Sequence, residues 1–375
     1  MPKEKSSVHL LLVSGQNVPN LLPFLDRDHK PSHAVLLVTR DMAANADILQ
    51  SMLQARGIAV QSAAVDPYKI EEMGRTILEL LETFDGFDVS LNVTGGTKIM
   101  ALGAYEAFKD LGRSRVYYVD TVNRRSIQLH PELCVSPLPD LLRVGDSLNC
   151  LGLRIEKQRS PNIDSAKFKL TQWIAENSHR LQKSVEILNA CAAQAEKTLL
   201  AEFSFHPKKD LMGLVRRYEE AGELVLTKGD RIVFKDEEAR LFVQGGWLET
   251  LTLGTLNRLK AEREIFDHAS NLEVVTLNGV RNELDAAFTA RNRLHVIECK
   301  TSVMKSKDAA GEKDLIYKLE KLREASGGIM TRAMLVSFRA MPEAMRRRCR
   351  EYRLNIVEGR DLARLDQHIR NWISS

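Results

Sequence analysis

NELDAAFTARNRLHVIECKTS (residues 282–302) places two acidic residues and a lysine in a pattern that predicts a β-hairpin. Apolar residues and β-formers flank the acids, and a polar run separates the two apolar segments, so we expect two antiparallel strands joined by a tight turn. Because successive strand side chains alternate between faces, Glu298 and Lys300 share one face and Cys299 occupies the other. The hairpin brings Asp285 alongside Glu298.

These residue types are the ones that metal-dependent phosphodiester cleavage requires. Mg²⁺ and Mn²⁺ are hard cations that take carboxylate, carbonyl and water oxygens, so Asp285, Glu298 and the backbone carbonyl of Cys299 are the predicted metal ligands. Such a metal activates a bound water and stabilises charge on the phosphate. Lys300 would position or deprotonate that water, with a pKa lowered by partial burial. The alternative is a surface hairpin with a salt-bridged Glu298–Lys300 pair.

Asp285 followed by Glu298-Cys299-Lys300 resembles the D…(D/E)xK signature of the PD-(D/E)xK nucleases, which have the restriction-endonuclease-like fold. Leu284 stands where the family usually has proline. The resemblance implies that GGWLETLTLGTLNRL (residues 245–259) is the first helix of the nuclease fold. It also implies that Glu249, on this helix, joins the catalytic and metal-binding site.

The whole chain has 375 residues, which is too long for one ordinary core and predicts two or three domains. Its net charge of +4 is modest support for a polyanionic partner. The five cysteines form no CxxC pair, and nothing resembles a signal peptide or a membrane span, so we expect a cytoplasmic protein without a membrane partner.

Residues 8–139 alternate apolar strands with amphipathic helices, which predicts a doubly wound parallel sheet of the α/β class. Ligands of such sheets bind beyond the carboxyl ends of the strands. The candidate ligand-binding residues that follow the strands are Ser14, Gln16, Asn17, Thr39, Arg40, Met42, Thr94, Gly95, Gly96, Thr97 and Lys98.

The TGGTK turn at residues 94–98 has the most specific composition of these segments. Its two glycines let the backbone approach a ligand, and a helix that begins near Thr97 adds a positive end, so the turn favours a phosphate. The spacing matches neither a Walker loop nor a Rossmann fingerprint. The alternative is a plain strand-to-helix turn.

NVTGGTKIMALGAYEAF (residues 92–108), together with SGQN (residues 14–17), resembles the CARF domain of CRISPR-associated proteins, a Rossmann-like sensor of cyclic oligoadenylates. With the C-terminal motif, the architecture resembles the CARF plus PD-(D/E)xK ancillary nucleases of type III CRISPR systems. The resemblance implies a homodimer whose paired CARF domains bind cyclic tetra-adenylate across the two-fold axis. It places residues 94–98 on the ring, with Gln16, Asn17, Arg40 and Met42 as further lining.

The middle of the chain, residues 141–244, predicts a helical or winged-helix-like connector between a CARF domain (1–140) and a nuclease domain (245–375). A helix at 211–221 precedes a hairpin that turns at 228–230, as in a winged helix. Phosphate contacts from this segment would come from Arg216, Arg217, Lys228 and Arg231. A solvated helix face on a connector is the alternative.

The C-terminal end predicts a helix at 311–325 with Lys318 as a phosphate contact, a buried strand at 331–338, and a basic helix whose arginines at 346–348 could guide substrate. We therefore expect a dimeric, metal-dependent nuclease of single-stranded DNA, RNA or nicked duplex. Activator binding would reorient the CARF lobes, and the rotation would pass through the middle segment. The alternatives are a ligand-responsive DNA-binding regulator with a vestigial nuclease fold, and a constitutive repair-type nuclease.

Overall fold

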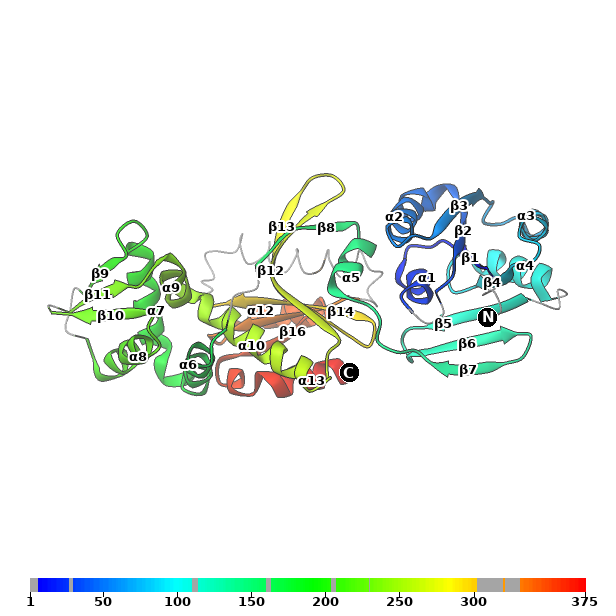
Figure 1. Ribbon diagram of the computed structural model, residues 1–375. Helices are drawn as coiled ribbons and strands as arrows, with labels where there is room; N and C mark the ends of the chain where they lie inside the picture. The colour runs from blue at the N-terminus through cyan, green and yellow to red at the C-terminus, as the bar shows by residue number, and fades with distance from the viewer. Residues whose placement is uncertain are drawn as a thin grey trace, which may run out of the picture.

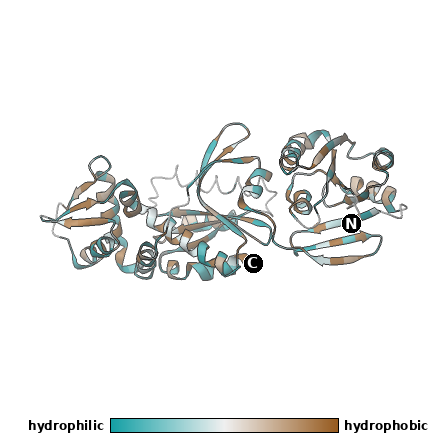
Figure 2. Ribbon diagram, viewed as in Figure 1, coloured by the Kyte–Doolittle hydropathy of each residue, from teal (hydrophilic) through white to brown (hydrophobic). Residues whose placement is uncertain are grey.

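The computed structural model describes residues 6–26, 30–109, 114–159, 163–203, 207–228, 230–301, 320 and 331–375. Within these residues the strands form three sheets of seven, three and six strands. Each sheet belongs to a separate body, and the three bodies are arranged in a row (Figure 1). Hydrophobic residues concentrate in the strands, as Figure 2 shows, and the central strands are almost wholly buried. None of the helices in these ranges has both the length and the apolar character that crossing a bilayer requires.

The N-terminal sheet has the strand order β3-β2-β1-β4-β5-β6-β7, with β3 to β5 parallel and β6 and β7 antiparallel. This arrangement confirms the predicted doubly wound sheet. The strands are β1 (Ser7–Leu12), β2 (His33–Val38), β3 (Ala59–Ala64), β4 (Asp88–Asn92), β5 (Ser114–Asp120), β6 (Arg125–His130) and β7 (Cys134–Pro137).

Helices cover both faces of this sheet because its central strands are apolar on both sides. Leu11 and Leu36 pack with α1 and α2, whereas Leu10 and Val35 pack with α3 and α4. Because successive side chains of a strand point to opposite faces, each central strand contributes side chains to both hydrophobic cores. The helices are α1 (Val18–Leu21), α2 (Ala43–Gln54), α3 (Ile70–Thr83) and α4 (Lys98–Lys109).

The C-terminal sheet has the order β16-β15-β14-β13-β12-β8. Its strands are β8 (Leu153–Gln158), β12 (Asp267–Thr276), β13 (Arg281–Ala290), β14 (Arg293–Lys300), β15 (Thr331–Ser337) and β16 (Asn355–Glu358). Pairing is antiparallel from β8 to β14 and parallel from β14 to β16. The predicted strand at 331–338 is thus confirmed as β15.

Four helices sandwich the C-terminal sheet. Residues of α10 (Trp247–Ala261) and α13 (Leu365–Ser374) share one core with one face of the sheet, and residues of α5 (Val144–Cys150) and α12 (Glu343–Glu351) share a second core with the other face. The predicted basic helix is α12. The predicted helix at 311–325 and its Lys318 lie outside the described residues, except for position 320.

Residues 163–244 form a small module with the winged-helix-like content that the sequence predicts. The helices are α6 (Ser165–Glu176), α7 (Ser178–Gln194), α8 (Lys209–Glu220) and α9 (Glu237–Leu241), beside a sheet of order β10-β11-β9. Its strands are β9 (Leu200–Glu202), β10 (Leu224–Thr227) and β11 (Arg231–Phe234). The module shares one continuous hydrophobic core with the C-terminal domain.

The segment expected to connect the two domains, residues 141–244, has two parts in the structure: residues 141–159 join the domains, and the module lies elsewhere. In Figure 1 the module lies on the side of the nuclease-like domain that is remote from the N-terminal domain. The chain leaves the N-terminal domain through α5 and enters the C-terminal sheet directly as β8, which pairs with β12. The segment assigned to 141–244 therefore contributes a strand to the C-terminal sheet before it builds the module, and no part of the module stands between sensor and hairpin.

Candidate functional site

The hairpin that carries the acidic motif closes with a two-residue turn. Arg291 and Asn292 both have a φ of 54°, the left-handed conformation that a type I′ turn requires. From this turn the ladder runs from the pair Ala290–Arg293 to the pair Ala286–Ile297. The predicted antiparallel hairpin and its tight turn are confirmed.

Beyond these pairs, β13 and β14 part, and Asp285 and Glu298 are the next residues on each strand. Oδ2 of Asp285 accepts a hydrogen bond of 2.7 Å from the Cys299 N–H, so a side chain replaces the backbone partner at this fork. On β12, Asn271 has a φ of 48° and stands across from Asp285 in the β12–β13 ladder, between the pairs Ser270–Ala286 and Leu272–Leu284.

Glu298 and Lys300 share a face, as the alternation of the strand predicts. Lys300 Nζ lies 3.2 Å from Glu298 Oε1, and Glu298 is only 4% exposed. The side chain of Cys299 points the other way, where its Sγ lies 3.4 Å from Thr252 Oγ1 on α10. The Glu298–Lys300 ion pair expected of a plain surface hairpin is thus present. Its carboxylate is buried, however, and burying a charge destabilises the fold unless other interactions or a function compensate.

Glu249 reaches the same site from the first turn of α10. Burial raises its pKa to about 7, and repulsion from Asp285 and Glu298 adds to the effect. The preceding glycines allow the helix to begin here: a Cβ on Gly245 would lie 2.5 Å from Thr301 Oγ1, just beyond Lys300. Glu249 is therefore held among like charges, and its part in catalysis and metal binding stays a prediction.

Lys300 has a different electrostatic character from the one expected. Partial burial opposes its charged form, but attraction from Glu298 and Asp285 outweighs burial, so the net pKa is raised. The expectation of a lowered pKa is wrong in direction because the sequence does not show how closely the carboxylates surround the ammonium. Lys300 is a cation that can donate to a phosphate oxygen and is a poor base.

Carboxylates are ligands that suit a hard divalent cation, and Glu249 interacts electrostatically with Asp285 and Glu298 at the fork. In the described residues no three His, Cys, Asp or Glu side chains are arranged closely enough to hold a metal ion. Asp285 and Glu298 instead engage protein donors, the Cys299 N–H and the Lys300 ammonium. A cation would therefore have to compete with these two contacts.

The TGGTK turn is shaped by contacts that only glycine permits. A Cβ on Gly95 would lie 2.0 Å from the carbonyl oxygen of Leu12, and Gly96 has a φ of 71°. The Thr97 hydroxyl accepts from the Met100 N–H and donates to the Pro67 carbonyl, so it caps α4. Lys98 is exposed at the start of α4.

Two buried asparagines below this turn were missed by the sequence analysis. Asn92 Oδ1 accepts from the backbone N–H and the hydroxyl of Thr94, and its Nδ2 donates to Asn20 Oδ1. Asn20 in turn donates to the carbonyl of Leu12. Apolar neighbours hid them, although a polar residue ending a buried strand is a usable signal. The Thr94 hydroxyl also accepts from the Val119 N–H, so the side chain of Thr94 serves the turn itself.

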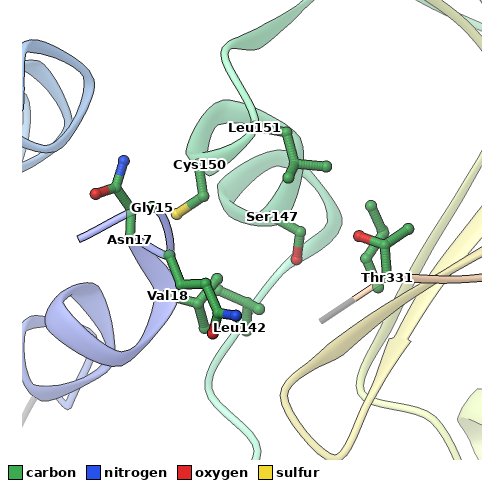
Figure 3. A pocket seen from close by; sticks show the side chains of 10 residues that line it. Gly15, Asn17, Val18, Leu142, Ser147, Cys150, Leu151 and Thr331 are labelled. Carbon is green, nitrogen blue, oxygen red and sulfur yellow. The ribbon is translucent and has the colours of Figure 1, made fainter. Parts of the chain in front are cut away.

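The other candidate ligand residues follow adjacent parallel strands, β1 and β2. Ser14 and Gln16 contact each other in the loop after β1, and Arg40 is exposed after β2, with Thr39 buried and Met42 half-buried. Asn17 is buried and donates to the carbonyl of Asn45. Gly15, Gln16, Asn17 and Val18 also line a pocket whose remaining walls come from α5, Leu142, Leu294 and Thr331 (Figure 3).

The candidate phosphate contacts of the module and of α12 are partly engaged within the protein. The Arg217 guanidinium lies 4.6 Å from the centroid of the Trp173 ring, and Arg231 pairs with Glu202. Arg346 pairs with Glu358, whereas Arg347 and Arg348 are exposed. Arg216 and Lys228 are exposed as well, and their contacts with phosphates stay a prediction.

Both ends of the chain match models of known protein families. The family model described as Card1 CARF domain matches residues 8–140, and the one described as Card1-like, endonuclease domain matches residues 236–375. The crystal structure of protein VC1899 from Vibrio cholerae is 29% identical, with a TM-score of 0.89 over 98% of each chain. The comparison with curated proteins gave no match.

Two further structures are similar. Can2 from Sulfobacillus thermosulfidooxidans, in complex with cyclic tetra-adenylate, is 27% identical with a TM-score of 0.80, covering 98% of this chain and 100% of that chain. A type III CRISPR defence DNA nuclease activated by cyclic oligoadenylate is 22% identical, with a TM-score of 0.59 over 91% of this chain and 47% of that chain, and shows likeness of fold alone. The two domain models match separate parts of the sequence, so the chain combines an N-terminal CARF domain with a C-terminal Card1-like endonuclease domain.

Proposed function

We propose that the protein is a metal-dependent nuclease of CRISPR defence that is activated by a cyclic oligoadenylate, with cyclic tetra-adenylate as the activator. The observation that carries the proposal is the fork of β13 and β14, where Glu249, Asp285 and Glu298 repel one another beside Lys300. The Can2 structure holds cyclic tetra-adenylate and matches this chain along its whole length, which supports the choice of activator.

Asp285, Glu298, Glu249 and the Cys299 carbonyl would hold Mg²⁺ or Mn²⁺ in this proposal. When bound, such an ion supplies an activated water and stabilises the charge that develops on the phosphate. The protein's own contribution is positional. Asp285 is oriented by the Cys299 N–H, and the Lys300 ammonium, kept protonated by its carboxylate neighbours, binds a phosphate oxygen.

The activator would bind at the carboxyl ends of β1, β2 and β4. Here the backbone of residues 94–98 and the exposed Lys98 and Arg40 offer donors to phosphates. Exposed apolar side chains lie next to this turn, on α4 at Ile99 and Leu102 and before α3 at Tyr68. Such side chains favour a second copy of the chain, so we propose a homodimer that shares one symmetric ligand.

The proposal is tested by cleavage of single-stranded DNA, duplex DNA and RNA by the full-length protein, with Mg²⁺, Mn²⁺ or chelator. Cyclic tri-, tetra- and hexa-adenylate are titrated in each case. We expect cleavage that needs both metal and cyclic tetra-adenylate. Sequence-specific duplex binding without cleavage would favour the regulator, and cleavage insensitive to every ring would favour the constitutive nuclease.

A further inference from the structure

Asn292 lies at the turn of the catalytic hairpin, and its side chain faces the segment by which the chain leaves the CARF domain. Its Oδ1 accepts from the N–H groups of Leu141 and Leu142, at 2.8 Å and 3.1 Å, and its Nδ2 donates to the carbonyl of Pro139 at 2.7 Å. Asn292 is 1% exposed. One buried amide therefore fastens the interdomain segment to the hairpin.

The turn alone does not require this side chain. Arg291 has the same left-handed φ as Asn292, and glycine satisfies such a position at least as well as asparagine. The three hydrogen bonds of Asn292 all go to backbone more than 140 residues away in sequence. The amide thus serves the junction between the domains.

Neighbouring contacts make the junction a defined interface. Asp267, at the start of β12, accepts from the Val144 N–H at the start of α5. Asp146 on α5 pairs with Arg56, which follows α2 of the CARF domain. Gly15, Asn17 and Val18 of the CARF domain lie on one side of α5 in Figure 3, and Thr331 of the C-terminal sheet lies on the opposite side of this helix. All four residues line the same pocket.

We propose that Asn292 is a positioning residue that couples the CARF domain to the catalytic hairpin. The ladder between β13 and β14 is continuous from the turn to the pair Ala286–Ile297, next to Asp285 and Glu298. Six residues of strand span roughly 20 Å. A displacement of the interdomain segment is therefore delivered through Asn292 and along the paired strands to the fork. The inference rests on the proposed function, because it concerns the response to activator.

The test compares Asn292→Gly with Arg291→Gly in the full-length protein. Both variants place glycine at a left-handed position of the same turn, but only the first removes the three junction bonds. The measured quantity is the ratio of cleavage rates with saturating and without cyclic tetra-adenylate, in Mn²⁺. The ratio is expected to fall at least about five-fold in Asn292→Gly, the lower end of typical coupling, and to stay at the wild-type value in Arg291→Gly.

The binding constant for cyclic tetra-adenylate and the thermal midpoint are measured alongside. Asn292→Asp keeps the two acceptor bonds and tolerates the left-handed φ, so it should give an intermediate ratio even if Asn292→Gly is poorly folded. Equal ratios in the wild type, Asn292→Gly and Asn292→Asp would overturn the inference and leave the proposed function standing. A wild type that does not respond to the activator would refute both.

Discussion

At the fork of β13 and β14, burial and the negative charges of Asp285 and Glu298 disfavour the charged form of Glu249 and raise its pKa to about 7. Replacing it by the uncharged isostere in Glu249→Gln removes this repulsion, which should stabilise the metal-free protein by about 1 kcal/mol while cleavage falls. Thermal unfolding in chelator and cleavage in Mn²⁺ measure the two effects. Glu283→Gln is the control, since Glu283 is exposed on β13, the strand that carries Asp285, and is the smallest of the contributors to the raised pKa of Glu249. A lower midpoint for Glu249→Gln would show that the carboxylate stabilises the fold.

His295 is a second buried titratable side chain of the hairpin. It stacks on Phe288 at 4.5 Å and meets the edge of Trp372, and burial, aided by Arg332, Arg293 and Arg291, lowers its pKa to about 3. Below the unfolded value of 6.5 the unfolded chain binds the extra proton, so stability falls as pH falls.

At pH 5 this difference in proton binding amounts to about 2 kcal/mol for His295 alone. The fall in the thermal midpoint between pH 7 and pH 5 should therefore be smaller in His295→Phe, which keeps an aromatic ring but cannot titrate. Identical falls in the variant and the wild type would show that His295 does not take up the proton on unfolding.

Single residues also mark where sequence reasoning succeeded. Asp285, Glu298 and Lys300 were predictable as one group because strand alternation and a short turn are local properties. The raised pKa of Lys300 was not, because burial opposes it and only the structure shows that Glu298, on the same strand, and Asp285, on the neighbouring strand, together outweigh burial. The junction role of Asn292 was hidden for the same reason, since an asparagine in a tight turn already has a local explanation.

At the scale of elements, α10 must be placed accurately because it carries Glu249. It crosses α6 at Gly254, where an added Cβ would lie 2.3 Å from the Phe168 ring. Gly254→Ala should force the two helices apart and destabilise the protein by about 1–3 kcal/mol. Thermal or denaturant unfolding measures this change.

A double-mutant cycle identifies the cause of that loss. Gly254→Ala combined with Phe168→Leu should recover part of the stability, because the smaller side chain makes room for the methyl group. Gly213→Ala in α8, where nothing lies within 4 Å of the added Cβ, should be neutral or stabilising. Additive losses in the double variant would show that the two helices do not meet at this glycine.

The sequence predicted those helices and strands whose pattern of apolar residues is visible within a few positions. It did not predict the strands whose place in a sheet depends on a partner far away in the chain. The five parallel strands of the CARF domain and the catalytic hairpin follow apolar patterns that are legible within a few residues. β8 has mostly exposed side chains and pairs with a strand more than 110 residues away, so nothing in LRIEKQ assigns it to the nuclease sheet. The π-helical turn at Phe242–Gly246 that leads into α10 had no signal beyond its glycines.

At the scale of the whole molecule, chain order is a poor guide to spatial order. The sequence suggested sensor, connector and nuclease in a row, but the CARF domain touches the nuclease domain directly and the module lies beyond it (Figure 1). In the proposed mechanism the activating signal therefore has a short route, through α5 and the turn of the hairpin.

The central claim is that the fork of β13 and β14 is where cleavage occurs and that the CARF domain controls it without being part of it. The most direct measurement is the cleavage rate of Asp285→Ala at saturating cyclic tetra-adenylate and Mn²⁺, with activator affinity measured on the same protein. We predict a loss of at least about 100-fold in rate with unchanged affinity. A variant that cleaves at the wild-type rate would contradict the account.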